Sequence, residues 1–178
     1  MKTIIHATRQ LLLLTSMGFF ASPFLTAEIV TNYQSPEKFT DFKVTSITKK
    51  STQRIFDREI KRNRVLQLIG GEGRTLELNF TDIDMAGYID PFVGRFPSNS
   101  IRIIKSTFPP RLEFTYALKN AEGTSIAMGE VNLSDIGLST KNSLRGYRQT
   151  NSFSFELELI ENWAIKTFSG NEETEEQS

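Results

Sequence analysis

Residues 75–81 have the sequence TLELNFT, and residues 111–118 have the sequence RLEFTYAL. Apolar and polar side chains alternate in both segments, which is the period of a half-buried β-strand. Residues 119–123, KNAEG, are typical of a hairpin loop, and residues 125–133 then supply a returning strand. These segments predict antiparallel strand pairing in a sheet with one buried face.

Two helices are predicted before and after these strands. Residues 52–69 contain neither Gly nor Pro, and Gly70-Gly71 follows them as a helix end. Residues 154–168 place apolar side chains on one face and charged ones off it. With short strands predicted at residues 28–33 and 101–107, this order predicts an α+β fold. We expect an antiparallel sheet of about four to five strands, with two main helices packed to one side.

A change of phase within residues 125–133 predicts a β-bulge. Ile126 and Met128 occupy even positions, whereas Val131 and Leu133 occupy odd ones. One extra residue in a strand produces such a change, so we expect the bulge at Gly129-Glu130.

The chain is predicted to hold one globular domain between two non-globular ends. Residues 1–27 have the pattern of an export signal, because basic residues precede an apolar stretch and Ala27 stands at the expected cut. Residues 28–170 then form a single α+β domain. Residues 171–178, with four Glu and no apolar side chain, form a disordered acidic tail. No apolar span of about 20 residues follows the signal, so we expect no transmembrane segment after cleavage and a periplasmic or secreted location.

The composition excludes several reaction types. The 178 residues include no Cys and a single His, which lies at position 6 within the predicted signal. Catalysis by Ser-His-Asp or Cys-His needs an imidazole, and zinc sites draw most of their ligands from Cys and His. We therefore expect neither mechanism, no zinc site and no cofactor. The 21 basic residues balance the 21 acidic ones and no recognisable motif is present, so we expect no nucleic acid partner.

Asp82 and Asp84 are the candidate functional residues that the strand pattern indicates. They share the parity of the apolar residues in 75–81, which predicts that they lie at the rim of the apolar face. Arg111 opens a neighbouring strand after two prolines, so we predict one polar cluster of Asp82, Asp84 and Arg111 at the edge of the sheet. With Asp90, the two acids are also a weak calcium candidate. The ordinary alternative is that both acids hold turn amides or pair with an arginine.

A second candidate is a basic surface on the first predicted helix. Arg54, Arg58 and Lys61 follow one another at the helical spacing i, i+4 and i+7. Residues 49–64 hold seven basic side chains and two acidic ones, which gives this segment a net charge of +5. Such a surface favours an anionic envelope component as its partner. The ordinary alternative is a solvated helix face.

Four short motifs along the chain form a family pattern. They are SPEKFTD at residues 35–41, FTDIDMAG at residues 80–87, PPR at residues 109–111, and Phe155-Glu156 with Trp163. In this order they resemble a family of exported proteobacterial proteins, domain of unknown function number 3016. The resemblance extends from Ser35 to Phe168. It implies a signal peptide and an exported location, and it brings no activity.

The function predicted from the sequence is that of a non-enzymatic exported protein, which binds or assists a component of the cell envelope. The alternative is a carboxylate-dependent glycan hydrolase that uses two acids among Asp82, Asp84 and Asp90. This alternative is kept because carboxylates are among the few catalytic groups that the composition leaves.

Overall fold

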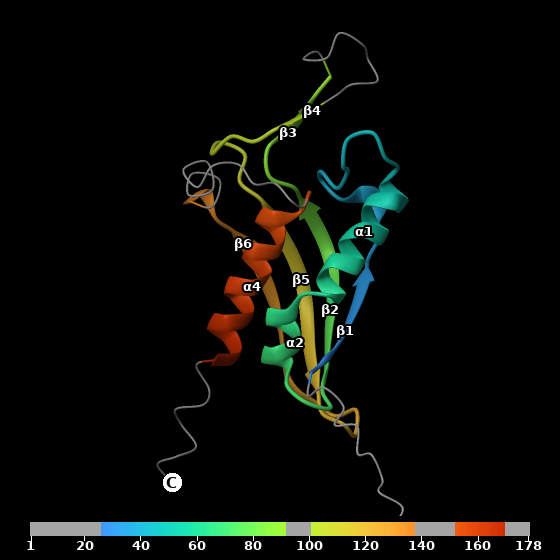
Figure 1. The fold of residues 1–178 in the computed structure, drawn as a ribbon, viewed down its shortest axis with the longest axis vertical. Coiled ribbons are helices and arrows are strands. Elements are labelled where there is room, and N and C mark those ends of the chain that lie inside the picture. The colour runs from blue at the N-terminus through green and yellow to red at the C-terminus, as the bar shows by residue number, and fades with distance from the viewer. Residues whose placement is uncertain (1–25, 92–100, 138–151, 170–178) are drawn as a thin grey trace, which may run out of the picture.

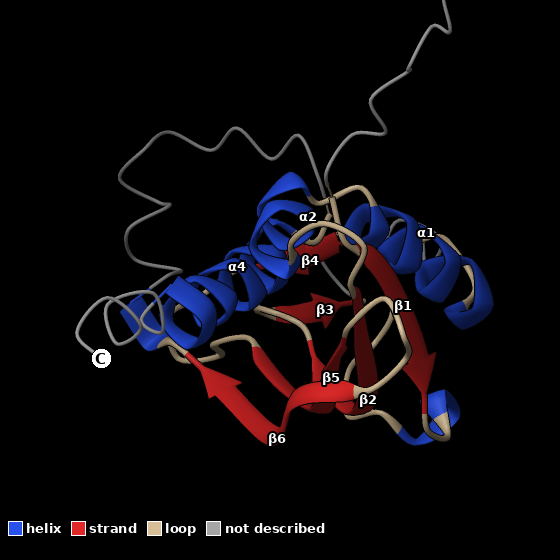
Figure 2. Cartoon of the chain, turned by 90° about the horizontal axis from the view of Figure 1, so that it is seen from below, coloured by secondary structure: helices blue, strands red, loops and turns tan. Residues whose placement is uncertain are grey.

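The structure is a computed structural model that describes residues 26–91, 101–137 and 152–169. Its main layer is a four-stranded sheet in the order β1-β2-β5-β6. The α-helices of the described residues cover one face of this sheet (Figures 1 and 2). A small second sheet of β3 and β4 lies beyond one end of the main sheet (Figure 1). The expected α+β class is confirmed.

Most of the predicted elements are present, with small changes of length. The described elements, in chain order, are β1 (Glu28–Tyr33), the 3-10 helix η1 (Pro36–Lys38), α1 (Lys49–Lys61), α2 (Arg64–Gly70), β2 (Thr75–Asp84), β3 (Tyr88–Asp90), β4 (Ile101–Ile103), β5 (Arg111–Lys119), β6 (Ser125–Ser134) and α4 (Ser154–Phe168). The bounds of β1 and α4 are those predicted, and β5 and β6 each extend one residue further. β3 has no counterpart in the sequence prediction, and β4 is shorter than residues 101–107.

β2, β5 and β6 form the predicted antiparallel hairpins, but β1 does not follow this pattern. β1 pairs with β2 in parallel, from Glu28 opposite Thr75 to Tyr33 opposite Phe80. The prediction of an entirely antiparallel sheet is therefore wrong at this edge. The connection explains the difference, because α1 and α2 return the chain across the helical face and β2 starts beside the start of β1.

The single helix predicted over residues 52–69 is in fact two helices. The side chain of Thr48 caps α1 by accepting a hydrogen bond from the Ser51 amide at 3.1 Å. The side chain of Asn63 caps α2 in the same way, from the Leu66 amide at 3.2 Å. An Asn that satisfies the free amides of a new first turn lets the chain change direction without Gly or Pro. The second helix ends at Gly70, within the predicted Gly70-Gly71 stop, and Gly71 caps it with a φ of 82°.

The bulge lies in β2 and not at Gly129-Glu130. The register between β2 and β5 shifts between Phe80 and Asp82, so Thr81 is the extra residue. The β5–β6 pairing runs without a shift past Gly129, and Ile126 and Met128 lie on the exposed face, where 48% and 67% of their surface is accessible. These two apolar residues therefore lie on the solvent-exposed side of the sheet, and their positions in the sequence do not indicate the buried side.

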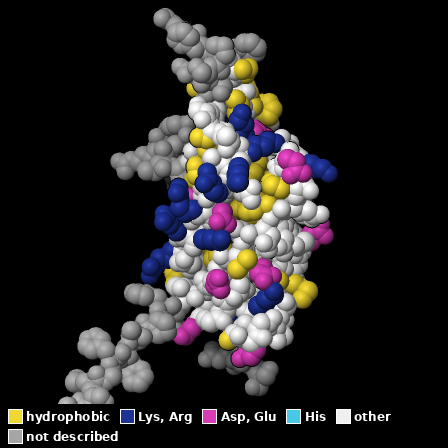
Figure 3. Space-filling model, turned by 90° about the vertical axis from the view of Figure 1, so that its right-hand side faces the viewer, with side chains coloured by type: hydrophobic (Ala, Val, Ile, Leu, Met, Phe, Trp, Pro, Cys, Tyr) yellow, Lys and Arg dark blue, Asp and Glu magenta, His cyan; other side chains and the backbone are white. Residues whose placement is uncertain are grey.

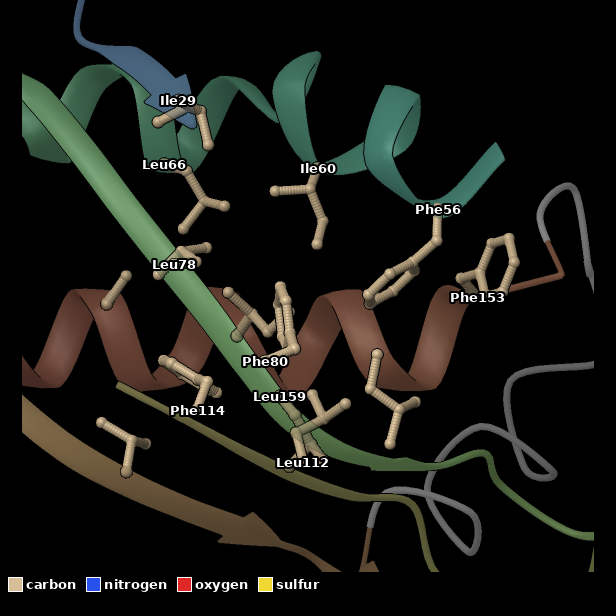
Figure 4. Close-up of a cluster of buried hydrophobic side chains, with 14 of the residues drawn as sticks. Ile29, Phe56, Ile60, Leu66, Leu78, Phe80, Leu112, Phe114, Phe153 and Leu159 are labelled. Atoms are coloured by element: carbon tan, nitrogen blue, oxygen red, sulfur yellow. The ribbon is translucent and has the colours of Figure 1, made fainter. Parts of the chain in front are cut away.

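The core fills the space between the helices and the covered face of the sheet. Figure 4 shows its central rings, and Phe56 of α1 lies between Phe80 of β2 and Phe153 at the start of α4, with ring centroids 5.7 and 5.0 Å away. Phe80 in turn contacts Phe114 of β5 at 5.4 Å. These aromatic contacts join α1, β2, β5 and the start of α4, which are far apart in the sequence. Within the described ranges, no helix combines the length and apolarity that crossing a membrane requires.

Candidate functional site

The bulge decides which way the acids of the FTDIDMAG segment point. Leu76, Leu78 and Phe80 face the helices, and beyond the bulge Ile83 takes over this role with no exposed surface. Asp82 lies opposite Glu113, on the face of the sheet turned away from the helices, called the outer face below. The prediction that Asp82 and Asp84 continue the apolar face is therefore wrong, because Thr81 reverses the alternation.

Asp82 fastens the preceding loop to the end of β2. Its two carboxylate oxygens accept hydrogen bonds from the backbone amide and the hydroxyl of Thr40, each at 2.7 Å. This arrangement is the ordinary alternative of the sequence analysis, in which an acid holds an amide of a turn.

Asp84 and Arg111 lie side by side as register partners at the end of β2 and the start of β5. Within the described residues no ion pair joins Arg111 to Asp82 or Asp84, and Arg111 is exposed. The pKa of Asp84 is raised, chiefly by burial and then by the charges of Asp41 and Asp82, while Arg111 and Arg102 act against the increase. Two arginines thus face this acidic end of the sheet.

Asp90 belongs to the small second sheet, where it pairs with Ile101. Among the residues that the structure describes, no group of three acidic or histidine side chains is arranged to hold a metal ion. The described geometry therefore does not gather Asp82, Asp84 and Asp90 around a cation.

Arg102 of β4 forms an ion pair at this end of the sheet that the sequence analysis did not predict, and its partner is Asp41. Its guanidinium meets both carboxylate oxygens of Asp41, at 3.0 and 3.1 Å. It also donates to the carbonyl oxygens of Lys43, Met85 and Ala86, at 2.9, 3.4 and 3.1 Å. Only 13% of the side chain is exposed, and its Nε is buried without a hydrogen-bond partner among the residues that the structure describes. The sequence gives little sign of this role, since Arg102 stands alone between two isoleucines.

Glu156, in the first turn of α4, is the most deeply buried acid described. It is 1% exposed, and its Oε1 accepts the backbone amide of Ala86 at 2.8 Å. Its Oε2 is buried and has no hydrogen-bond partner within residues 26–91, 101–137 and 152–169. Burial raises the pKa of Glu156 to about 7, against the opposing effects of the Ala86 amide, its own backbone amide and Arg102.

A cavity of about 170 Å³ lies where these two side chains meet. It is bounded by the loop after Asp41, the end of β2, β4 and the start of α4, and it is partly open to solvent. Polar and apolar atoms share the wall about equally, and six of the ten lining residues have apolar side chains. These six are Val44, Met85, Ala86, Ile101, Ile104 and Phe155. The charged side chains in the wall are Arg102 and Glu156, so the cavity combines an apolar body with a cation and an acid.

A separate charged surface surrounds α1. It consists of Lys49, Lys50, Arg54, Arg58, Lys61, Arg62 and Arg64, called the α1 basic surface below, and all seven are exposed. The two acids of the segment, Asp57 and Glu59, are only partly exposed, and they pair with Lys61 at 3.1 Å and with Arg58 at 3.6 Å. Figure 3 looks onto this side and shows basic side chains gathered there, with few acidic ones among them.

The motifs of the family pattern meet in space. Residues 35–41 are held by Asp82 and carry Asp41, which binds Arg102. Ala86 belongs to FTDIDMAG, and Glu156 belongs to the closing helix that the pattern includes. These hydrogen bonds therefore join three of the motifs around the Arg102–Glu156 cavity.

Comparison with known proteins agrees with this pattern. Residues 27–166 match the family described as "Protein of unknown function (DUF3016)". No curated protein and no solved structure gives a significant match. Because the matched residues make up most of the 178, the chain belongs to the DUF3016 family.

Proposed function

We propose that this chain is an exported, non-enzymatic protein that binds the anionic phospholipid surface of the cell envelope through the α1 basic surface. The observation that carries the proposal is the unequal exposure of charge around α1. All seven cations reach solvent, whereas both acids are partly buried beside them. The net charge of +5 therefore faces outward on one side of the molecule.

Electrostatic attraction between the α1 basic surface and an anionic membrane is strong enough for reversible attachment. A Lys or Arg close to an anionic membrane contributes about 1 kcal/mol, so five uncompensated cations contribute about 5 kcal/mol at most. Attraction of this kind falls off within a Debye length, about 8 Å at physiological salt. Since α1 lies on the outside of the helical layer, its cations can approach a flat surface within that distance (Figure 2).

The hydrolase alternative receives no support from the geometry. Both carboxylate oxygens of Asp82 are occupied by Thr40, and Asp84 lies beside Arg111 on the outer face. Asp90 sits apart from them in the small sheet.

Vesicle binding tests the proposal. We expect the chain to sediment with vesicles that contain phosphatidylglycerol and to stay in solution with pure phosphatidylcholine vesicles. High salt, about 1 M, should release it, because the Debye length then falls to about 3 Å. The double variant Arg54→Glu/Arg58→Glu should lose most of the binding.

A matched variant controls for net charge. Arg74→Glu/Lys166→Glu changes the total charge by the same amount at two exposed residues outside the α1 basic surface, and it should keep most of the binding. Equal loss in the two variants would show that total charge and not α1 determines attachment. Equal binding of the native chain to both kinds of vesicle would reject the proposal.

A further inference from the structure

We infer that a groove between β6 and α4 is a docking site for an extended segment of another protein, which pairs with β6 as a further strand and carries an apolar and an acidic side chain on its inward face. The groove, called the β6–α4 groove below, has a volume of about 510 Å³. Figures 1 and 2 show α4 beside β6. It shares no lining residue with the Arg102–Glu156 cavity or with the α1 basic surface.

β6 leaves an edge of the main sheet free for pairing. It is the outermost strand in the order β1-β2-β5-β6, and within the described residues no strand pairs with its other side. Its ten residues include neither Pro nor Lys, two residues that often prevent pairing at natural sheet edges. The backbone groups on such an edge alternate as donors and acceptors, and another extended backbone matches them along its length.

The β6–α4 groove follows this edge. Residues 132–135 all line it. Leu133 faces the helices, opposite the buried Leu112, whereas Asn132 lies on the outer face and donates to Glu113 Oε1 at 3.0 Å. Since neighbouring side chains of a strand point to opposite faces, a groove that touches four consecutive residues runs along the strand edge, where the free backbone groups lie.

α4 supplies the second wall of the groove. Its contribution is one stripe of the helix, at the helical spacing of three and four residues. The members of this stripe are Leu159, Asn162, Trp163, Lys166 and Thr167. The Trp163 ring is held by the rings of Phe114 and Tyr116, whose centroids are 5.0 Å away. With Leu133 and Leu159 it gives an inward apolar side chain of an added strand an ordered surface to cover.

Lys166 sets the charge of the segment that fits. It is exposed, and within residues 26–91, 101–137 and 152–169 no ion pair involves it. The acid in the described lining is Asp135, whose Oδ1 already accepts the Gly137 amide at 2.6 Å. An acidic side chain two residues from the apolar one lies on the same face of the added strand and complements Lys166.

A second copy of this chain does not match that requirement. When two β6 strands pair antiparallel about a twofold axis, each sheet keeps its helices on the same side. The inward side chains of the added β6 are then those that face the helices now. They are Ala127, Gly129, Val131 and Leu133, and none of them is acidic. Symmetric pairing would therefore leave Lys166 without a partner.

The parts of the sequence outside the described residues do not match it either. Residues 170–178 hold four Glu but no apolar side chain, so they cannot cover the apolar lining. Residues 1–25, 92–100 and 138–151 contain no Asp or Glu, so they cannot pair with Lys166. A segment with both kinds of side chain is therefore assigned to another protein.

The heptapeptide acetyl-TETLTET-amide is the probe for this site. Its leucine and two glutamates lie on one face of an extended strand, and it presents an acid on either side of the leucine in both strand directions. Trp163 is the single tryptophan of the chain, and the probe has no aromatic residue, so the fluorescence of Trp163 follows occupation of the groove. We expect a saturable change in this fluorescence with the full chain. The ¹H–¹⁵N spectrum should show shifts of the backbone amides of residues 132–135.

Three altered probes separate the parts of the recognition. Acetyl-TETSTET-amide lacks the apolar side chain and should bind about tenfold more weakly or worse. Acetyl-TQTLTQT-amide lacks the acids and should bind about threefold more weakly. A form of acetyl-TETLTET-amide that is N-methylated at its three central residues keeps every side chain but can pair at neither edge, and it should lose binding by about tenfold or more.

A variant of the chain tests the role of Lys166. Lys166→Gln should weaken the binding of acetyl-TETLTET-amide by about threefold and leave that of acetyl-TQTLTQT-amide unchanged. Lys38→Gln removes an exposed lysine outside the groove and should leave both affinities unchanged.

Four results would overturn the inference. If acetyl-TETLTET-amide produces no saturable change, the groove takes no extended segment. If the N-methylated probe binds as tightly, β6 does not pair with it. If Lys166→Gln weakens both probes equally, or neither, no acid is recognised at Lys166. If the native chain is a dimer in sedimentation equilibrium and acetyl-TETLTET-amide dissociates it, a second copy occupies the groove.

Discussion

Replacing Glu156 by Gln should make the stability of the protein much less dependent on pH. The Gln amide keeps an oxygen that can accept the Ala86 amide, but it cannot ionise. Burial raises the pKa of the native carboxyl from its ordinary value of 4.5 to about 7. The charged groups that act on it are Arg102 from β4 and Asp41 from the preceding loop, and both remain in the variant.

The sign and size follow from proton linkage. Between pH 4.5 and 7 the folded native protein keeps the proton on Glu156, whereas the unfolded chain releases it. The free energy of unfolding therefore decreases as pH rises through this interval, by about 1.36 kcal/mol per unit. Over about 2.5 units this amounts to roughly 3 kcal/mol, all of it absent from Glu156→Gln. The native protein should thus be close to the variant in stability near pH 4, and roughly 3 kcal/mol less stable near pH 8.

Urea unfolding at a series of pH values measures this difference. The fluorescence of Trp163, whose ring packs against Phe114 and Tyr116 at 5.0 Å each, provides the signal. The variant Glu130→Gln removes an exposed acid and controls for the loss of one negative charge. If the gap between Glu156→Gln and the native protein stays constant from pH 4 to 8, Glu156 ionises as an exposed acid does, and our account of its burial is refuted.

Three further predictions concern the same region and the start of the chain. Arg102→Ala should destabilise the protein by about 3 kcal/mol, the lower end of the range for a broken buried ion pair. Arg111→Ala should cost less than about 1 kcal/mol, because this arginine is exposed. Urea unfolding of both variants compares the two losses, and equal losses would contradict the conclusion that Arg102 and not Arg111 forms the structural ion pair. Gly87→Ala should cost about 1–2 kcal/mol for its positive φ and about 1–3 kcal/mol more for the contact with the Ile103 carbonyl, since an added Cβ would lie 2.1 Å from that oxygen. Gly123 also has a positive φ, but a Cβ added there meets nothing within 4 Å, so Gly123→Ala measures the backbone strain alone. Equal losses of stability in the two variants would rule out a contribution from the Ile103 carbonyl. The mature protein should begin at Glu28 and occur outside the cytoplasm, which N-terminal sequencing of cell fractions decides; an intact Met1 in the cytoplasm would contradict export.

The parts of the fold that the sequence predicts well are those set by local periodicity. The bounds of β1 and α4 follow from runs of apolar side chains at strand and helix spacing. The direction of β1 could not be predicted in this way, because parallel and antiparallel edge strands have the same alternation. The division of the first helix has a local signal, the capping residue Asn63, but Asn also occurs within helices and becomes informative only with the tertiary contacts of α2.

The candidate site was predicted less well, because it depends on contacts between distant segments. Asp82 was identified, and its role as an acceptor for turn amides was the ordinary alternative. Arg102 was missed, since nothing near it in the sequence shows that Asp41 lies within reach. Glu156 appeared only within the family pattern, because an acid in the first turn of a helix is usually solvated there. Its burial depends on distant residues such as Ala86, whose amide donates to its carboxylate, and no local pattern reveals this contact.

The bulge at Thr81 links the fold to the cavity, and its signal was present in the sequence. Apolar residues occupy even positions at Leu76, Leu78 and Phe80 and then odd positions at Ile83 and Met85. Without the extra residue, either Ile83 would face solvent or Asp82 would enter the core, and an unpaired carboxylate in a core is far more costly than one unpaired residue in a strand. The bulge therefore keeps the apolar face continuous and turns Asp82 outward to Thr40. It also delivers Met85 and Ala86 to the interior, where the Ala86 backbone holds Arg102 and Glu156. The same change of phase in residues 125–133 has no such consequence, because on edge strand β6 Ile126 and Met128 simply remain exposed.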